Sequence, residues 1–225
     1  MSDKDHRRQP RFVVEGLHGR MTFASEVEIV NMSLSGVALK LGRRLNIGSE
    51  YTLKLEVHDK TLSVKGVIVW SALDERKSGA KGEDVLVYSA GMKFTDVLTQ
   101  RLMELVAFID DNKLIEEKRL GGLRFYIDAP GKALLDVPRP YHVKVISIRG
   151  MLIEADYRLE PEQRCPMEMT MQEGEAPLSF MGRVAFCAEA KGETGVHQLG
   201  IEFQDLSSAD RNRLDAFIQS LAKKT

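Results

Sequence analysis

Cysteine, aromatic residues and long apolar runs are all scarce in this chain of 225 residues, and each shortage excludes a class of protein. Two cysteines, Cys165 and Cys187, cannot build a disulfide framework, and the five histidines lack the spacing of zinc ligands. No apolar run approaches the ~18 residues of a membrane-spanning helix. The polar start MSDKDHRRQP is also unlike a signal peptide. The sequence therefore predicts a soluble, cytoplasmic protein without a metal, a cofactor or a transmembrane segment.

An excess of charge of one sign is missing too, because 32 lysines and arginines are balanced by 33 aspartates and glutamates. Such a balance gives no general attraction to nucleic acid or acidic membranes, so an anion site must come from a local basic cluster. Aromatic residues make up 7% of the chain and do not alternate with basic ones, as they do on many nucleic-acid-binding faces. No DNA or RNA partner is predicted.

Short runs with alternating apolar residues follow the N-terminal segment. In GVALKL and YTLKLEV every second side chain is apolar, which is typical of a strand with one buried face. The runs lie at residues 27–29, 36–41, 51–57, 62–70 and 85–94, with an exposed loop expected at 74–84. Because about six strands at roughly ten-residue spacing have no helix between them, a small antiparallel barrel is predicted.

The periodicity changes after residue 95. Apolar residues from Leu98 to Ile109 recur at helical spacing, which predicts a helix that ends or weakens near Asp110. The charged stretch EEKR at 116–119 is interpreted as a solvated helix end, and Gly121-Gly122 as a boundary.

The second half of the chain repeats the order of the first. GMKFTDVLTQRLMELVAFI (91–109) matches GIEFQDLSSADRNRLDAFI (200–218) without a gap. GVIVW (66–70) likewise resembles GRVAF (182–186), and NMSLSGVAL (31–39) resembles VISIRGMLI (145–153). A repeat of this length indicates two copies of one barrel-plus-helix domain.

A basic cluster lies at the start of the chain, in an N-terminal arm that we define as residues 1–11. Arg7 and Arg11 form an RxxxR pair, and Asn31, Ser33 and Gly36 follow as NxSxxG. Each half alone is weak, since arginine pairs are common on surfaces and NxSxxG also describes a turn whose glycine has positive φ. Together, in this order and ahead of the GVALKL strand, they are much more specific.

This combination resembles the PilZ domain family, receptors for the bacterial second messenger cyclic di-GMP, in which RxxxR precedes [D/N]xSxxG on a six-stranded barrel. The GVIVW and GMKF strands and the helix after them are similar to the family too, so the resemblance covers about the first half of the chain at full motif strength. With the repeat, it implies a mainly β protein of two six-stranded antiparallel PilZ-like β-barrels, each followed by a C-terminal α-helix. The expected domains are 1–118 and 119–225.

The resemblance also implies the ligand-binding residues. They are Arg7, Arg8, Arg11, Asn31, Ser33 and Gly36. A guanidinium group pairs bidentately with phosphate or with guanine O6 and N7 and stacks on a base, whereas lysine supplies only a point charge. The asparagine and serine would be fixed hydrogen-bond partners, and Gly36 would leave room for the ligand. A solvated basic N-terminus that binds nothing specific is the alternative.

The second copy departs from this motif. Ser147 and Gly150 remain, but Val145 stands in the place of the asparagine and has no hydrogen-bonding side chain. Aligning Arg124-Phe125 with Arg11-Phe12 leaves no RxxxR pair. We therefore expect a degenerate domain that serves as an interaction or dimer surface.

Two other features have structural interpretations. The alternating residues of CPMEMTM (165–171) resemble a soft-metal site but favour one packed face of a strand. Trp70, at the end of an alternating run, is expected in the core or at its rim instead of stacked on a base.

The sequence thus predicts a cyclic di-GMP receptor that changes domain orientation or partner binding when the ligand clamps the arm. No GxSxG elbow, P-loop or HExxH motif is present, so no enzyme activity is predicted. A nucleotide-independent PilZ-like scaffold for protein–protein interaction is the alternative. The downstream protein partner is not identified by any pattern, and a homodimer is left open.

Overall fold

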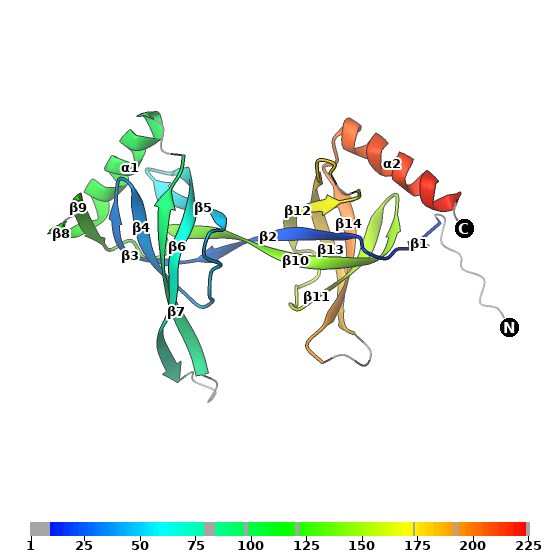
Figure 1. Cartoon of the computed structure of the whole chain (residues 1–225), viewed down its shortest axis with the longest axis horizontal. Helices are drawn as coiled ribbons and strands as arrows, with labels where there is room; N and C mark the ends of the chain where they lie inside the picture. Colours follow the sequence, from blue (N-terminus) through cyan, green and yellow to red (C-terminus); the bar gives the residue numbers. More distant parts are fainter. Residues whose placement is uncertain are drawn as a thin grey trace. The chain divides into compact units, whose positions relative to one another are not determined.

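The structure is a computed structural model that describes residues 10–78, 84–96, 99–119, 122–172, 174–190, 192 and 194–223. The chain forms two compact units. The central unit is Ala24–Val137, and the terminal unit combines Pro138–Thr225 with the N-terminal Met1–Phe23. Each unit contains one antiparallel barrel and one helix (Figure 1).

The barrel of the central unit is built from short strands with one buried face. The elements of the unit are β3 (Glu28–Ser33), β4 (Gly36–Leu41), β5 (Glu50–Val57), β6 (Lys60–Ser78), β7 (Asp84–Phe94), α1 (Thr99–Asn112), β8 (Lys113–Arg119), β9 (Gly122–Ile127) and the start of β10 (Ala133–Ser147). The strand order is β10-β5-β6-β7-β4-β3-β9-β8. The barrel closes where Val27 N–H donates to Ala133 O at 3.2 Å.

The terminal unit repeats this plan. Its elements are β1 (Phe12–Val13), the start of β2 (His18–Glu26), the end of β10, β11 (Gly150–Ala155), β12 (Arg164–Thr170), β13 (Leu178–Glu189), β14 (His197–Gln204) and α2 (Ser208–Ala222). The order β10-β11-β14-β13-β12-β2 runs around the barrel, and β1 pairs with β10. Closure comes from Val143 N–H, which donates to Leu17 O at 2.9 Å.

Each core contains residues from both sequence repeats. In the central unit, Leu135 of β10 is fully buried and joins the side chains of β4, β5 and β6. In the terminal unit, Met21 of β2 is fully buried and joins those of β10 to β14. Helix α1 buries Leu105 and Phe108 in the central core, and α2 buries Leu214 in the terminal core. These contacts satisfy the apolar faces that the alternating pattern predicts.

The two repeats therefore exchange their N-terminal segments. Figure 1 shows the dark blue β1 beside β10, and the green β9 beside the blue β3. The registers correspond: Val13 lies opposite Val145, and Tyr126 lies opposite Asn31. The compact units consequently do not follow the predicted ranges 1–118 and 119–225, because both unit boundaries fall inside strands, after Phe23 in β2 and after Val137 in β10.

The predicted fold class is confirmed, since the chain is mainly β with two six-stranded antiparallel barrels and a helix after each. Two local predictions are wrong. Residues 74–78 and 84 of the expected loop instead belong to β6 and β7, with Glu75 opposite Val87, and residues 79–83 lie outside the described residues. The segment expected to be a solvated helix end belongs to β8, whose residues 116–119 pair antiparallel with β9.

Packing confirms the repeat and the packed face predicted for 165–171. A Cβ on Gly91 would meet the Trp70 ring, and one on Gly200 would meet the Phe186 ring, so equivalent glycines face equivalent aromatic rings. Trp70 lies at the rim, with 44% of its surface exposed. Cys165, Met167 and Met169 form one buried face of β12, as the alternation predicts.

Candidate functional site

A serine turn joins the first two strands of each repeat motif. In the central unit, Ser33 Oγ accepts a hydrogen bond from Ser35 N–H at 3.3 Å and donates to Gly36 O at 3.3 Å. In the terminal unit, Ser147 Oγ accepts from Arg149 N–H at 3.4 Å and donates to Gly150 O at 3.0 Å. Both serines therefore hold the turn itself, which matches the tendency of serine to bond nearby backbone groups.

The glycine of each turn packs against a neighbouring strand. A Cβ on Gly36 would lie 2.5 Å from Met92 O, and one on Gly150 would lie 2.2 Å from Ile201 O. Neither glycine has a positive φ. The room beside Gly36 is thus filled by the backbone of β7, which differs from the expected space for a ligand.

Asn31 of the central unit already has a charged partner. Its Oδ1 accepts a hydrogen bond of 2.7 Å from Nη1 of Arg124, the residue of β9 immediately before the two that pair with β3. The asparagine is buried. Sequence reasoning did not predict this role for Arg124, although its alignment with Arg11 could have indicated it.

Arg11 lies in the terminal unit, immediately before β1. It lines a pocket of about 840 Å³ beside the turn formed by Ser147 and Gly150. The structure thus brings Asn31, Ser33 and Gly36 together in the central unit and Arg11 to the equivalent turn of the terminal unit. Arg7 and Arg8 lie outside the described residues.

The pocket of the terminal unit is rich in arginine. Arg149 and Arg211 line it together with Arg11, and none of the three guanidinium groups forms an ion pair within the described residues. Glu202 is the one carboxylate in the described lining. It accepts a hydrogen bond from Arg183 Nε at 3.2 Å. This hydrogen bond is the largest contribution to the raised pKa of the Arg183 guanidinium. The Glu202 carboxylate is therefore already paired with another cation.

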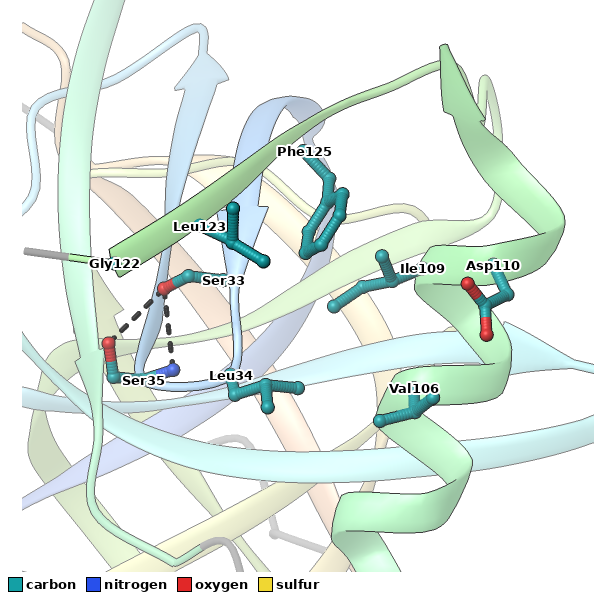
Figure 2. Close-up of a pocket in the computed structure, with 9 residues that line it drawn as sticks. All are labelled: Ser33, Leu34, Ser35, Val106, Ile109, Asp110, Gly122, Leu123 and Phe125. Atoms are coloured by element: carbon teal, nitrogen blue, oxygen red, sulfur yellow. Dashed lines mark hydrogen bonds between the residues drawn. The ribbon is translucent and has the colours of Figure 1, made fainter. Parts of the chain in front are cut away.

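The pocket at the equivalent turn of the central unit has a different character. It measures about 460 Å³ and lies between the Ser33 turn, β9 and α1 (Figure 2). Figure 2 shows the two serine hydroxyls at one end and the Phe125 ring directed toward Ile109. Its described lining has no cation, and its one carboxylate, Asp110, pairs with Lys113 at 2.7 Å. Such a pocket favours apolar groups over anions.

Two further kinds of feature do not occur among the residues that the structure describes. None of the described helices is both long and apolar enough to cross a membrane. Within the same residues, no group of three His, Cys, Asp or Glu side chains could hold a metal ion.

Comparison with known families gives one match. The family model for the PilZ domain matches residues 5–111 and again residues 118–220. No curated protein matches the chain.

Several solved structures overlap the chain at low sequence identity. MotI/DgrA, an inhibitor of motility from Bacillus subtilis, is 8% identical, with 80% of this chain and 99% of that chain covered and a TM-score of 0.33. YcgR from Escherichia coli, solved in complex with c-di-GMP, is 14% identical, with 77% and 84% covered and a TM-score of 0.33. Apo MrkH from K. pneumonia is 9% identical, with 92% and 86% covered and a TM-score of 0.35.

Proposed function

We propose that this chain, which belongs to the PilZ domain family, is a cytoplasmic receptor for cyclic di-GMP and not an enzyme. The observation that carries the proposal is the position of Arg11. It lines an open pocket beside a serine turn of the family motif, in a chain with no general excess of positive charge. A local cation at that turn is what a dianionic nucleotide requires.

The proposed contacts follow the chemistry of the ligand. Cyclic di-GMP has two phosphates and two guanines, and a guanidinium group can pair with either or stack on a base. We assign the principal contacts to Arg7 and Arg11 and an auxiliary contact to Arg8. Asn31 and Ser33 remain proposed contacts at the turn of the central unit, beside Arg124, with Gly36 as the glycine that closes this turn.

The signal would pass through the arm. Ligand that clamps the arm against a barrel changes the surface that the chain presents to a protein partner or to its own second domain. Coupling of this kind requires a ligand that binds the clamped state more tightly than the open one, and contacts made by arm residues supply that difference.

Titration calorimetry tests the proposal. Each well-placed guanidinium contributes about 1–3 kcal/mol, so Arg7→Ala and Arg11→Ala should each weaken cyclic di-GMP binding roughly ten- to a hundredfold. Arg158→Ala is the matched control, because this exposed arginine of the terminal unit lies outside the described pocket lining.

Two outcomes would contradict the proposal. Unchanged affinity in both arm variants would reject the assignment of the arginines. No binding of cyclic di-GMP by the unmodified protein would favour the nucleotide-independent scaffold instead.

A further inference from the structure

We infer that Arg149 and Arg211 are additional phosphate-binding residues, and that they make the terminal unit the high-affinity nucleotide site. This inference rests on the proposed function, and it names residues that the RxxxR and NxSxxG motifs do not specify. It also reverses the expectation that the second repeat is degenerate.

Three cations reach one pocket from three different elements. Arg11 precedes β1, Arg149 lies in the turn between β10 and β11, and Arg211 lies in the first turn of α2. All three line the pocket of about 840 Å³. Without carboxylate partners in the described residues, they keep their full charge available to a ligand.

The rest of the lining suits a nucleotide better than a bare anion. Phe186 lies in the same pocket with 47% of its surface exposed, so an aromatic face is available to a base. Glu202, which would repel a phosphate, is occupied by Arg183. A ligand with both phosphates and flat bases therefore uses more of this pocket than phosphate alone.

The central unit lacks both extra arginines. The match of 31–39 with 145–153 puts Ser35 opposite Arg149, and the match of 91–109 with 200–218 puts Leu102 opposite Arg211. Its Asn31 is already hydrogen-bonded to Arg124. A ligand there would have to displace that contact, whereas the arginines of the terminal pocket have no such partner to lose within the described residues.

The two arginines offset the loss of the motif asparagine. Val145 lines the terminal pocket and offers no side-chain hydrogen bond, but the guanidinium groups of Arg149 in the turn and Arg211 on α2 supply charge-assisted donors in the same pocket. The resulting site joins the arm of the first repeat to the barrel of the second, so neither repeat alone contains it.

Titration calorimetry on the full chain tests the inference with cyclic di-GMP as the probe. Arg149→Ala and Arg211→Ala should each lower the high-affinity binding constant about tenfold, and the double variant more than either. Arg149→Lys should recover only part of the loss, because an ammonium group cannot pair bidentately. Arg158→Ala is the control for removal of one exposed charge, and unchanged circular dichroism melts verify folding.

The outcomes separate the inference from the function on which it rests. If the unmodified chain binds cyclic di-GMP and neither arginine variant changes the affinity, the inference is overturned and the receptor function stands. The inference is overturned in the same way if Asn31→Ala removes the high-affinity binding while Arg149→Ala and Arg211→Ala do not. If the unmodified chain does not bind, both proposals fail.

Discussion

The central and terminal units share a barrel, a helix and a serine turn, but they differ in the charge around that turn. In the central unit the motif is complete, and Asn31 is hydrogen-bonded to Arg124 beside an apolar pocket. In the terminal unit the asparagine is replaced by Val145, yet three arginines line the pocket. The turn therefore forms with or without the asparagine, whereas the charge around it depends on the side chains that other elements bring to it.

Both barrels are also completed in the same way. Each barrel takes one segment from the other repeat, in the same register, so the two cores are mutually dependent on exchanged strands. Substitutions can test first this exchange and then the differences between the turns.

The largest effect is expected from truncation of an exchanged core residue. Leu135→Ala should destabilise the central unit by about 2–5 kcal/mol, because Leu135 is fully buried among strands of the first repeat. Met21→Ala should do the same to the terminal unit. Hydrogen exchange measured by mass spectrometry should show faster exchange in residues 28–94 for the first variant and in 143–204 for the second.

The single tryptophan gives an independent probe of this exchange. Trp70 belongs to the central unit, so its fluorescence transition in urea should shift for Leu135→Ala and stay unchanged for Met21→Ala. The opposite assignment of the two variants would mean that each repeat folds on its own segment.

A smaller effect is expected from two arginines at equivalent positions of the repeats, Arg11 before β1 and Arg124 in β9. Arg124→Ala leaves the buried Asn31 without its donor and should cost the central unit about 1 kcal/mol, with no change in high-affinity cyclic di-GMP binding. Arg11→Ala should weaken high-affinity cyclic di-GMP binding and leave stability nearly unchanged, because this exposed side chain contributes little to stability. Equal losses of affinity in both variants would show that the two units bind the nucleotide equally well.

The smallest expected effect is on the pH dependence of folding stability, and it has opposite signs in the two units. On β11, a hydrogen bond from Gln198, with further help from Lys144, lowers the pKa of Glu154 below its ordinary 4.5. The stabilisation that Glu154 contributes is present above pH 4.5 and is lost as the pH falls through the lowered pKa. At the equivalent place on β4, the hydrogen bond to Asp74 raises the pKa of Lys40 above 10.5. That contribution is lost as the pH rises through the raised pKa.

Denaturation between about pH 3 and pH 11 checks these signs. Glu154→Gln should weaken the acid dependence of the terminal unit, and Lys40→Met should weaken the alkaline dependence of the central unit. Both effects should be well below that of a core truncation, because the pairs are partly exposed. If Glu154→Gln leaves the acid dependence of stability unaltered, that dependence arises from other carboxylates.

Strands, helices and the duplication were predictable because their causes are local. Alternating apolar residues predicted β4 and β5 closely, and helical spacing predicted α1 to within a residue or two of its start. The length of the β6–β7 hairpin was underestimated, because its polar end is stabilised by backbone pairing, which leaves no apolar pattern in the sequence. For the candidate site, the turns at the motif serines and glycines were foreseen as an alternative interpretation of NxSxxG, but the packing of Gly36 against β7 and the grouping of Arg11 with Ser147 were not.

The sequence by itself determined the strands with alternating apolar residues, the places of the two turns and the duplication of the barrel. Only the tertiary structure decided which repeat receives each N-terminal segment. Phe12-Val13 and Phe125-Tyr126 meet their partner strands in the same register, so backbone hydrogen bonds and apolar contacts of the same kind form in either pairing. A local pattern cannot distinguish between them, and the choice depends on how the whole chain closes its two barrels.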